Sequence, residues 1–150
     1  MQILLGEFDC TMDAKGRIRV PSGLLKQLGE DGQAFVMNKG FETHLTLYPQ
    51  SVWDKTVKSF ESLNVYDNDT RNFLRRFHNG ATQIEIDDQS RILIPKRLAE
   101  YAKIEKEVIF YAFGDKIEIW DAALYEQFMN DKDVDMSALA QRVLGDKSKE

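Results

Sequence analysis

The chain has 150 residues, of which 43% are hydrophobic and 30% are charged, a composition typical of globular domains that excludes a wholly disordered or fibrous chain. The 25 acidic residues outnumber the 20 lysines and arginines, for a net charge of −5. This balance argues against nucleic-acid binding unless the basic residues are gathered in one region. No stretch approaches the ~18 apolar residues of a membrane span, no basic leader opens the chain, and there is a single cysteine. We therefore expect a cytoplasmic protein that does not contact membranes.

An internal duplication is the most informative feature of the sequence. Residues 13–21 recur as residues 87–95, with Asp, Arg, Ile and Pro at equivalent positions 74 residues apart. Gly40 and Gly114 keep this separation. The expected fold is therefore α+β, built from two tandem halves that each contain short β-hairpins and short helices.

Hydrophobic periodicity and turn residues predict the elements of each half. In the first half we expect strands at residues 8–12 and 17–20, a helix at 22–28, a hairpin of 34–39 with 44–48, and a closing helix that begins near Ser51. In the second half we expect strands at 83–87 and 91–94, a helix at 96–102, a hairpin of 108–113 with 116–120, and a closing helix capped by Asp121. Ser51 and Asp54 have the spacing of a capping box, and Cys10 alternates with Phe8 and Met12 as a buried strand residue.

The remaining segments divide the chain into four parts. A turn at residues 64–68 and a helix at about 69–78 connect the halves, and a polar, partly acidic tail follows Asp131. The expected division is 1–63, 64–80, 81–130 and 131–150, with one or two weak amphipathic turns in the tail and disorder from 145 to 150. A half of roughly 65–75 residues can bury only a thin core, so we expect the halves to pack together or the chain to oligomerise.

Nothing in the sequence points to catalysis. His44 and His78 stand at no metal-ligand spacing from Cys10. No phosphate-binding loop of the Walker or Gly-x-Gly-x-x-Gly type is present, and the carboxylates are scattered. We therefore expect no enzyme activity, no metal ion, no cofactor and no small-molecule ligand.

The repeated Asp-x-x-x-Arg turn is the feature that does suggest a site. Asp13 and Asp87 each end a strand, where a carboxylate can accept hydrogen bonds from turn amides, and Arg17 and Arg91 begin the next strand. Arg17 and Arg19 fall on one face of their strand, an array that suits contacts with phosphates and guanine edges. The alternative, in which each Asp only pairs with its own Arg to stabilise the turn, stays open on spacing alone.

The paired motifs, each followed by an apolar strand that ends in proline, resemble those of the MraZ family of bacterial transcriptional regulators. The likeness covers nearly the whole chain and includes Leu45-Thr46-Leu47-Tyr48-Pro49, His78-Asn79-Gly80-Ala81 and Ile117-Glu118-Ile119-Trp120. It implies two tandem swapped-hairpin half-domains of the SpoVT-AbrB superfamily. It also implies a sequence-specific DNA-binding regulator of the promoter of the cell-division and cell-wall gene cluster. Such a regulator would act on repeated promoter boxes as a ring-shaped homo-oligomer associated with the nucleoid.

The resemblance is carried onto this sequence residue by residue. It assigns DNA contact to Lys15, Gly16, Arg17, Arg19 and Arg91, and stabilisation of the loops to Asp13 and Asp87. The second copy has Gln89, Ser90 and Leu93 where the first has Lys15, Gly16 and Arg19. Because Arg91 then lacks basic neighbours in its own copy, we expect its mutation to have a milder effect than that of Arg17.

Further candidates for DNA contact are Gln89, Ser90, Arg75 and Arg76. Arg75 lies one helical turn from Arg71 on the connecting helix, and this face either contacts DNA or is a solvated face with salt bridges between subunits. Repeating one weakly basic loop around a ring gives avidity without a basic protomer, which answers the objection from net charge.

The alternative from another class is an antitoxin-like protein-interaction module with the AbrB fold. Such modules carry one domain and a disordered tail that wraps a second protein. Here the tail after Asp131 is short and the duplication is internal, which favours the DNA-binding interpretation.

Overall fold

Two β-sheets organise the chain in the computed structural model, which describes residues 3–145. The strands are β1 (Leu4–Thr11), β2 (Arg17–Arg19), β3 (Ala34–Lys39), β4 (Leu45–Pro49), β5 (Thr82–Glu85), β6 (Arg91–Leu93), β7 (Glu107–Gly114) and β8 (Lys116–Asp121). The larger sheet has the order β1-β7-β8-β4-β3-β5, and the smaller sheet pairs β2 with β6. The duplicated strands are β1 and β5, β3 and β7, and β4 and β8. Exchanging the members of each pair gives the same order read from the opposite edge of the sheet, so the two halves are related by an approximate twofold axis between β8 and β4.

The two halves exchange strands. β1 of the first half pairs with β7 of the second, and β5 of the second half pairs with β3 of the first. The return strands do the same, because β2 forms its ladder with β6. The backbone of β2 is joined to its own half by a bridge between Met12 and Ile18 and by hydrogen bonds between Asp13 and Arg17. The halves are therefore two interleaved hairpin units, as the swapped-hairpin prediction requires, and the α+β fold with tandem repeats is confirmed.

One hydrophobic core serves both halves. Ile18 and Phe35 from the first half and Ile92 and Phe110 from the second are fully buried in the same cluster. The expectation that the thin halves pack together is thus confirmed. Cys10 is buried in this core as predicted, and burial raises the pKa of its thiol to about 12.

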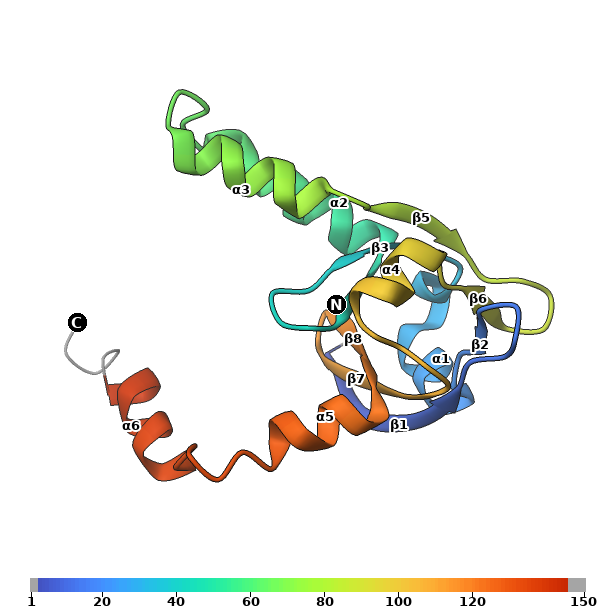
Figure 1. Ribbon diagram of the computed structural model, residues 1–150. Helices are drawn as coiled ribbons and strands as arrows, with labels where there is room; N and C mark the ends of the chain where they lie inside the picture. Colours follow the sequence, from blue (N-terminus) through green and yellow to red (C-terminus); the bar gives the residue numbers. More distant parts are fainter. Residues whose placement is uncertain (1–2, 146–150) are drawn as a thin grey trace.

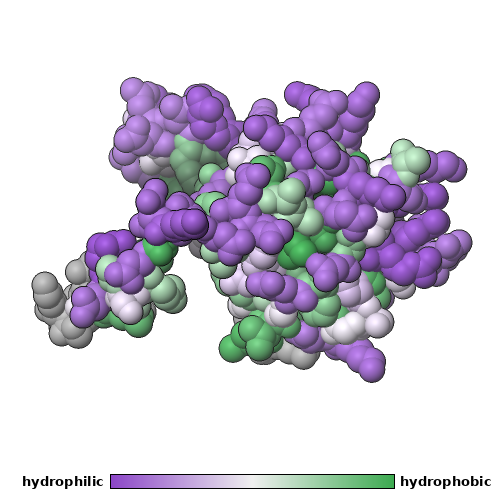
Figure 2. All heavy atoms as spheres, turned by 60° about the horizontal axis from the view of Figure 1, so that its bottom comes forward, coloured by the Kyte–Doolittle hydropathy of each residue, from purple (hydrophilic) through white to green (hydrophobic). Residues whose placement is uncertain are grey.

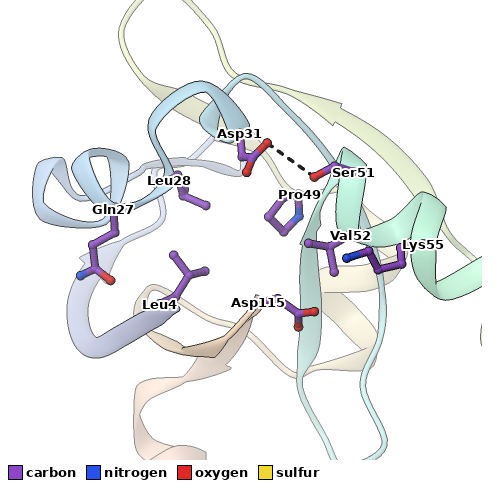
Figure 3. A pocket seen from close by; sticks show the side chains of 9 residues that line it. All are labelled: Leu4, Gln27, Leu28, Asp31, Pro49, Ser51, Val52, Lys55 and Asp115. Atoms are coloured by element: carbon purple, nitrogen blue, oxygen red, sulfur yellow. Dashed lines mark hydrogen bonds between the residues drawn. The ribbon is translucent and has the colours of Figure 1, made fainter. Parts of the chain in front are cut away.

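The helices differ from the predictions mainly at their ends. They are α1 (Ser22–Leu28), α2 (Gln50–Ser59), α3 (Asn68–His78), α4 (Lys96–Tyr101), α5 (Ala122–Met129) and α6 (Met136–Gly145), with 3-10 turns at Gly29–Gly32 and Phe60–Ser62. The capping box at Ser51 is wrong: α2 begins one residue earlier, and the Ser51 hydroxyl donates to Asp31 Oδ1 at 3.5 Å (Figure 3). The cap at Asp121 is confirmed, since its carboxylate accepts a hydrogen bond from Leu124 N.

Three of the described helices extend from the body formed by the sheets (Figure 1). α2 and α3 form an arm held by aromatic contacts, in which Phe77 stacks on Trp53 at 5.3 Å and meets Phe60 edge-on at 5.1 Å. α6 follows α5 after a short extended segment and projects away from the body (Figure 1). The tail thus contains a full ten-residue helix that includes Gly145, so the predicted disorder is wrong at this residue, and residues 146–150 lie outside the described part. Of the helices described, none is long and apolar enough to cross a membrane.

Candidate nucleic-acid interface

The first loop is closed by the carboxylate of Asp13. Its Oδ1 accepts hydrogen bonds from the backbone N–H groups of Lys15, at 3.0 Å, and Arg17, at 2.9 Å. Its Oδ2 accepts a third hydrogen bond from Arg17 Nε at 2.8 Å. Gly16 has a φ of 85°, a left-handed conformation that glycine adopts without strain. The side chain of Arg17 is therefore held at its Nε, while the N–H groups of its two terminal nitrogens can still donate hydrogen bonds to another molecule.

The second loop repeats the same hydrogen bonds. Asp87 Oδ1 accepts from the backbone N–H groups of Gln89, at 2.9 Å, and Arg91, at 2.8 Å, and Oδ2 accepts from Arg91 Nε at 2.8 Å. Ser90 occupies the position of Gly16 with a φ of 59°, which is uncommon for a residue with a side chain. The loop shape is thus kept although three side chains differ between the copies.

Both carboxylates stay charged at neutral pH. The pKa values of Asp13 and Asp87 are lowered from 3.8, chiefly by the hydrogen bond from the backbone N–H of the following arginine and also by its side chain. The three accepted hydrogen bonds favour the ionised form, so the loop geometry does not depend on pH in the neutral range.

Strand exchange brings the two loops together. β2 and β6 run antiparallel as a two-stranded ribbon at one end of the molecule (Figure 1). One further hydrogen bond joins each loop to the other half: Ile94 N donates to Gly16 O, and Val20 N donates to Ser90 O, both at 2.8 Å. Each loop is therefore also fixed by a residue of the other half, 78 positions away for Gly16 and 70 positions away for Ser90.

The outward face of the ribbon carries three arginines. Ile18 and Ile92 are paired across the ribbon and fully buried, so their neighbours in each strand point outward. Arg19 lies directly opposite Arg91, and Arg17 lies opposite Leu93, which is 55% exposed. The second copy supplies no basic neighbour to Arg91, but the exchanged strand of the first half does, so the inference that Arg91 stands without basic neighbours is wrong. The sequence showed the spacing of each motif but held no information on the pairing of β2 with β6.

The other predicted contact residues fall into two groups. Lys15 and Gln89 are exposed in the two loops, and Ser90 is half-buried beside the ribbon. Arg75 and Arg76 are exposed on α3, which lies on the opposite side of the molecule from the ribbon (Figure 1). One chain therefore does not bring these two arginines together with the loops.

Neither a metal cluster nor the cavity between α1 and α2 offers a second site in the described residues. In the described part of the chain, no group of three or more His, Cys, Asp or Glu side chains is placed to hold a metal ion. A cavity of about 90 Å³ lies between α1 and α2, with Leu4, Leu28 and Val52 among its lining residues (Figure 3). This volume is well below the roughly 300–1,000 Å³ of typical ligand pockets.

Comparison with known proteins identifies the family. Residues 3–76 and 77–147 each match the family described as "MraZ protein, putative antitoxin-like". Three relatives, each named transcriptional regulator MraZ, cover most of both chains. The relative from Christiangramia forsetii is 40% identical over 95% of this chain and 93% of its own. The relative from Thermoanaerobacter sp. (strain X514) is 38% identical over 94% and 96%, and that from Cytophaga hutchinsonii is 34% identical over the full length of both.

A solved structure is also similar in part. The solution structure of PHS018 from Pyrococcus horikoshii aligns over 79% of this chain and 89% of that chain, with 20% identity and a TM-score of 0.32, which is too low to relate the two folds. The sequence matches, in contrast, cover the whole duplicated unit, including both Asp-x-x-x-Arg loops. The chain therefore belongs to the MraZ family of transcriptional regulators and contains two tandem copies of the MraZ domain.

Proposed function

We propose that this chain binds double-stranded promoter DNA in a sequence-specific manner through the β2–β6 ribbon and its two loops. The observation that carries the proposal is the outward face of the ribbon, where Arg17, Arg19 and Arg91 lie side by side. A two-stranded ribbon fits the major groove of DNA, which is ~12 Å wide, and arginine is the side chain that most often contacts guanine there.

The hydrogen bonds of the loops give each residue a role. Asp13 and Asp87 hold the Nε atoms of Arg17 and Arg91, which fixes the direction of each guanidinium before DNA arrives. In residues 3–145 the terminal nitrogens of both arginines have no hydrogen-bond partner, so they are available to guanine O6 and N7 or to phosphate. Lys15, Gly16, Gln89 and Ser90 would contact the DNA backbone on either side.

The target and the assembly extend this proposal. The relatives are named as transcriptional regulators, which supports a promoter as the target of this chain, and we propose the promoter of the cell-division and cell-wall gene cluster that the family resemblance implies. A protomer with a net charge of −5 needs several ribbons acting together, because avidity compensates for weak single contacts. We therefore propose a ring-shaped homo-oligomer that binds repeated promoter boxes in the cytoplasm, at the nucleoid.

A gel-shift assay with the DNA upstream of the protein's own gene tests the proposal. We expect wild-type protein to shift this DNA and not a scrambled fragment, and Arg17→Ala to lose affinity while keeping its melting temperature. Lys58→Ala on α2 removes an exposed charge far from the ribbon and serves as the matched control. Wild-type affinity in Arg17→Ala would contradict the proposal.

The antitoxin-like alternative has one observation in its favour, which is the description of the matched family. It predicts a different result in the same assay. A protein that shifts no DNA but co-purifies with a second protein encoded beside it would support this alternative.

A further inference from the structure

The last helix presents an apolar face whose side chains Met136, Leu139 and Val143 stay exposed among residues 3–145. Met136, Leu139 and Val143 follow the i, i+3, i+7 spacing of one helix face and are 73%, 36% and 60% exposed. Figure 2 shows α6 standing apart from the body, with hydrophobic atoms on its surface. In the first half, α3 occupies the equivalent place after the closing helix, and there Phe77 is buried against α2. The second-half helix therefore lacks the cover that its counterpart has.

A basic groove lies on the other side of α3. It has a volume of about 640 Å³ and lies between α3, the β3–β4 loop and the end of α4. Its cations are Lys39, Arg75 and Arg76, and its exposed aromatic side chains include Phe41, at 83%, and Tyr101, at 37%. Lys39 Nζ donates to Asn79 Oδ1 at 2.7 Å and lies 5.2 Å from the centre of the Tyr101 ring. Among the described residues, Arg75 and Arg76 form no ion pair.

The segment that leads into α6 complements this groove in charge. Asp131, Asp133 and Asp135 alternate along the six residues before the helix, and all three are exposed. A helix of ten residues is ~15 Å long, and an amphipathic helix that places an apolar face in a groove is a common mode of recognition. Acidic residues followed by an apolar helix face thus match a groove that combines arginines with exposed aromatic rings.

We propose that α6 of one copy of this chain docks in the α3 groove of a second copy. Asp131, Asp133 and Asp135 face the groove arginines, and the apolar face of α6 covers Phe41 and Phe73. Because α6 points away from its own body, the contact is between chains and joins two different surfaces. A head-to-tail contact of this kind repeats from one copy to the next and closes into a ring when its rotation allows. The inference rests on the oligomer of the proposed function and names the surfaces that form it.

Light scattering coupled to size exclusion tests both surfaces at micromolar concentration. Leu139→Asp places a charge on the apolar face of α6, and Gln141→Asp adds the same charge on the opposite face as its control. Arg75→Glu with Arg76→Glu reverses the groove, and Lys55→Glu with Lys58→Glu makes the same change on exposed residues of α2. We expect the two interface variants to fall to the 17.3 kDa monomer and both controls to keep the wild-type mass. Val143→Asp repeats the α6 test should Leu139→Asp fail to fold.

Mixing the two interface variants tests the head-to-tail geometry. The Leu139→Asp chain keeps an intact groove and the Arg75→Glu/Arg76→Glu chain keeps an intact α6, so one working contact remains. We expect the mixture to give a species of two chains that neither variant forms alone. A wild-type monomer, or unchanged masses in both interface variants, would overturn the inference.

The inference is also separable from the proposed DNA contact. Arg17→Ala should lose DNA affinity while keeping the oligomeric mass, because Arg17 lies on the ribbon and not in the groove. A groove variant that keeps its mass but loses DNA affinity would show that the groove binds nucleic acid, and this result would overturn the docking of α6.

Discussion

Arg91→Ala is the substitution for which the structure changes the expected result. Sequence spacing gave Arg91 no basic neighbours, whereas the β2–β6 register places it directly opposite Arg19 on the outward face. If Arg91 contacts a base edge, its loss costs about 1–3 kcal/mol for each contact. At tenfold in affinity for every 1.4 kcal/mol, this is a roughly 5- to 150-fold increase in Kd for a single ribbon. We therefore expect Arg91→Ala to weaken binding as much as Arg19→Ala does.

The measurement is a titration of both variants against the same upstream DNA at several salt concentrations. A base contact would lower affinity for the specific site and leave non-specific affinity unchanged, whereas a phosphate contact would lower both and reduce the salt slope by about 0.9 for each lost contact. Melting temperatures serve as the control for folding, because Arg91 also holds Asp87 at 2.8 Å. The reasoning would be refuted by an Arg91→Ala protein with unchanged Kd beside an Arg19→Ala protein with a clear loss.

Three further substitutions or titrations test other parts of the structure. The pKa of Asp13 is lowered from 3.8, so its stabilising hydrogen bonds are fully present above 3.8 and are lost as pH falls through the lowered value. A carboxyl titration by NMR should therefore have its midpoint below 3.8, and a midpoint at or above 3.8 would contradict this. Cys10→Ser should leave DNA affinity unchanged, and the wild-type thiol should react with a thiol reagent only after unfolding, since burial raises its pKa to about 12. Gly40→Ala should lower the free energy of unfolding by about 1–3 kcal/mol, because a Cβ there would overlap the ring of His44. Urea titration checks this beside the control Gly23→Ala, whose Cβ would lie 3.4 Å from its nearest neighbour, Phe8 Cε1.

Local features of the fold could be predicted from the sequence. Short-range sequence patterns are sufficient where a feature depends only on neighbouring residues. This holds for the alternation around Cys10, the end of β2 before Pro21 and the helix cap at Asp121. Ser51 was misassigned because its hydroxyl has a partner distant in sequence, Asp31, which no local pattern contains. The candidate loops could be predicted for the same reason as the strands, since the hydrogen bonds that the Asp13 and Asp87 carboxylates accept all span four residues or fewer.

Longer-range features could not be predicted. Gly40 and Gly114 look equivalent in the sequence, yet only Gly114 has a left-handed φ, of 65°, whereas Gly40 makes room for the buried His44 ring stacked on Trp120 at 4.6 Å. The face that Arg17, Arg19 and Arg91 share could not be predicted either, because it arises from contacts between residues far apart in the sequence. It depends on which strand pairs with which, and an internal repeat is compatible with both separate and exchanged halves.

The approximate twofold axis has a consequence for the kind of DNA site that one chain selects. A true twofold dimer presents identical surfaces and therefore favours a palindromic site. Here the two surfaces share a backbone but not their side chains, because Arg19 on one strand corresponds to Leu93 on the other. A single covalent chain can diverge in this way, whereas two identical subunits cannot. In the proposed complex each protomer would therefore have a direction along the double helix, and copies arranged head to tail would select direct repeats rather than inverted ones.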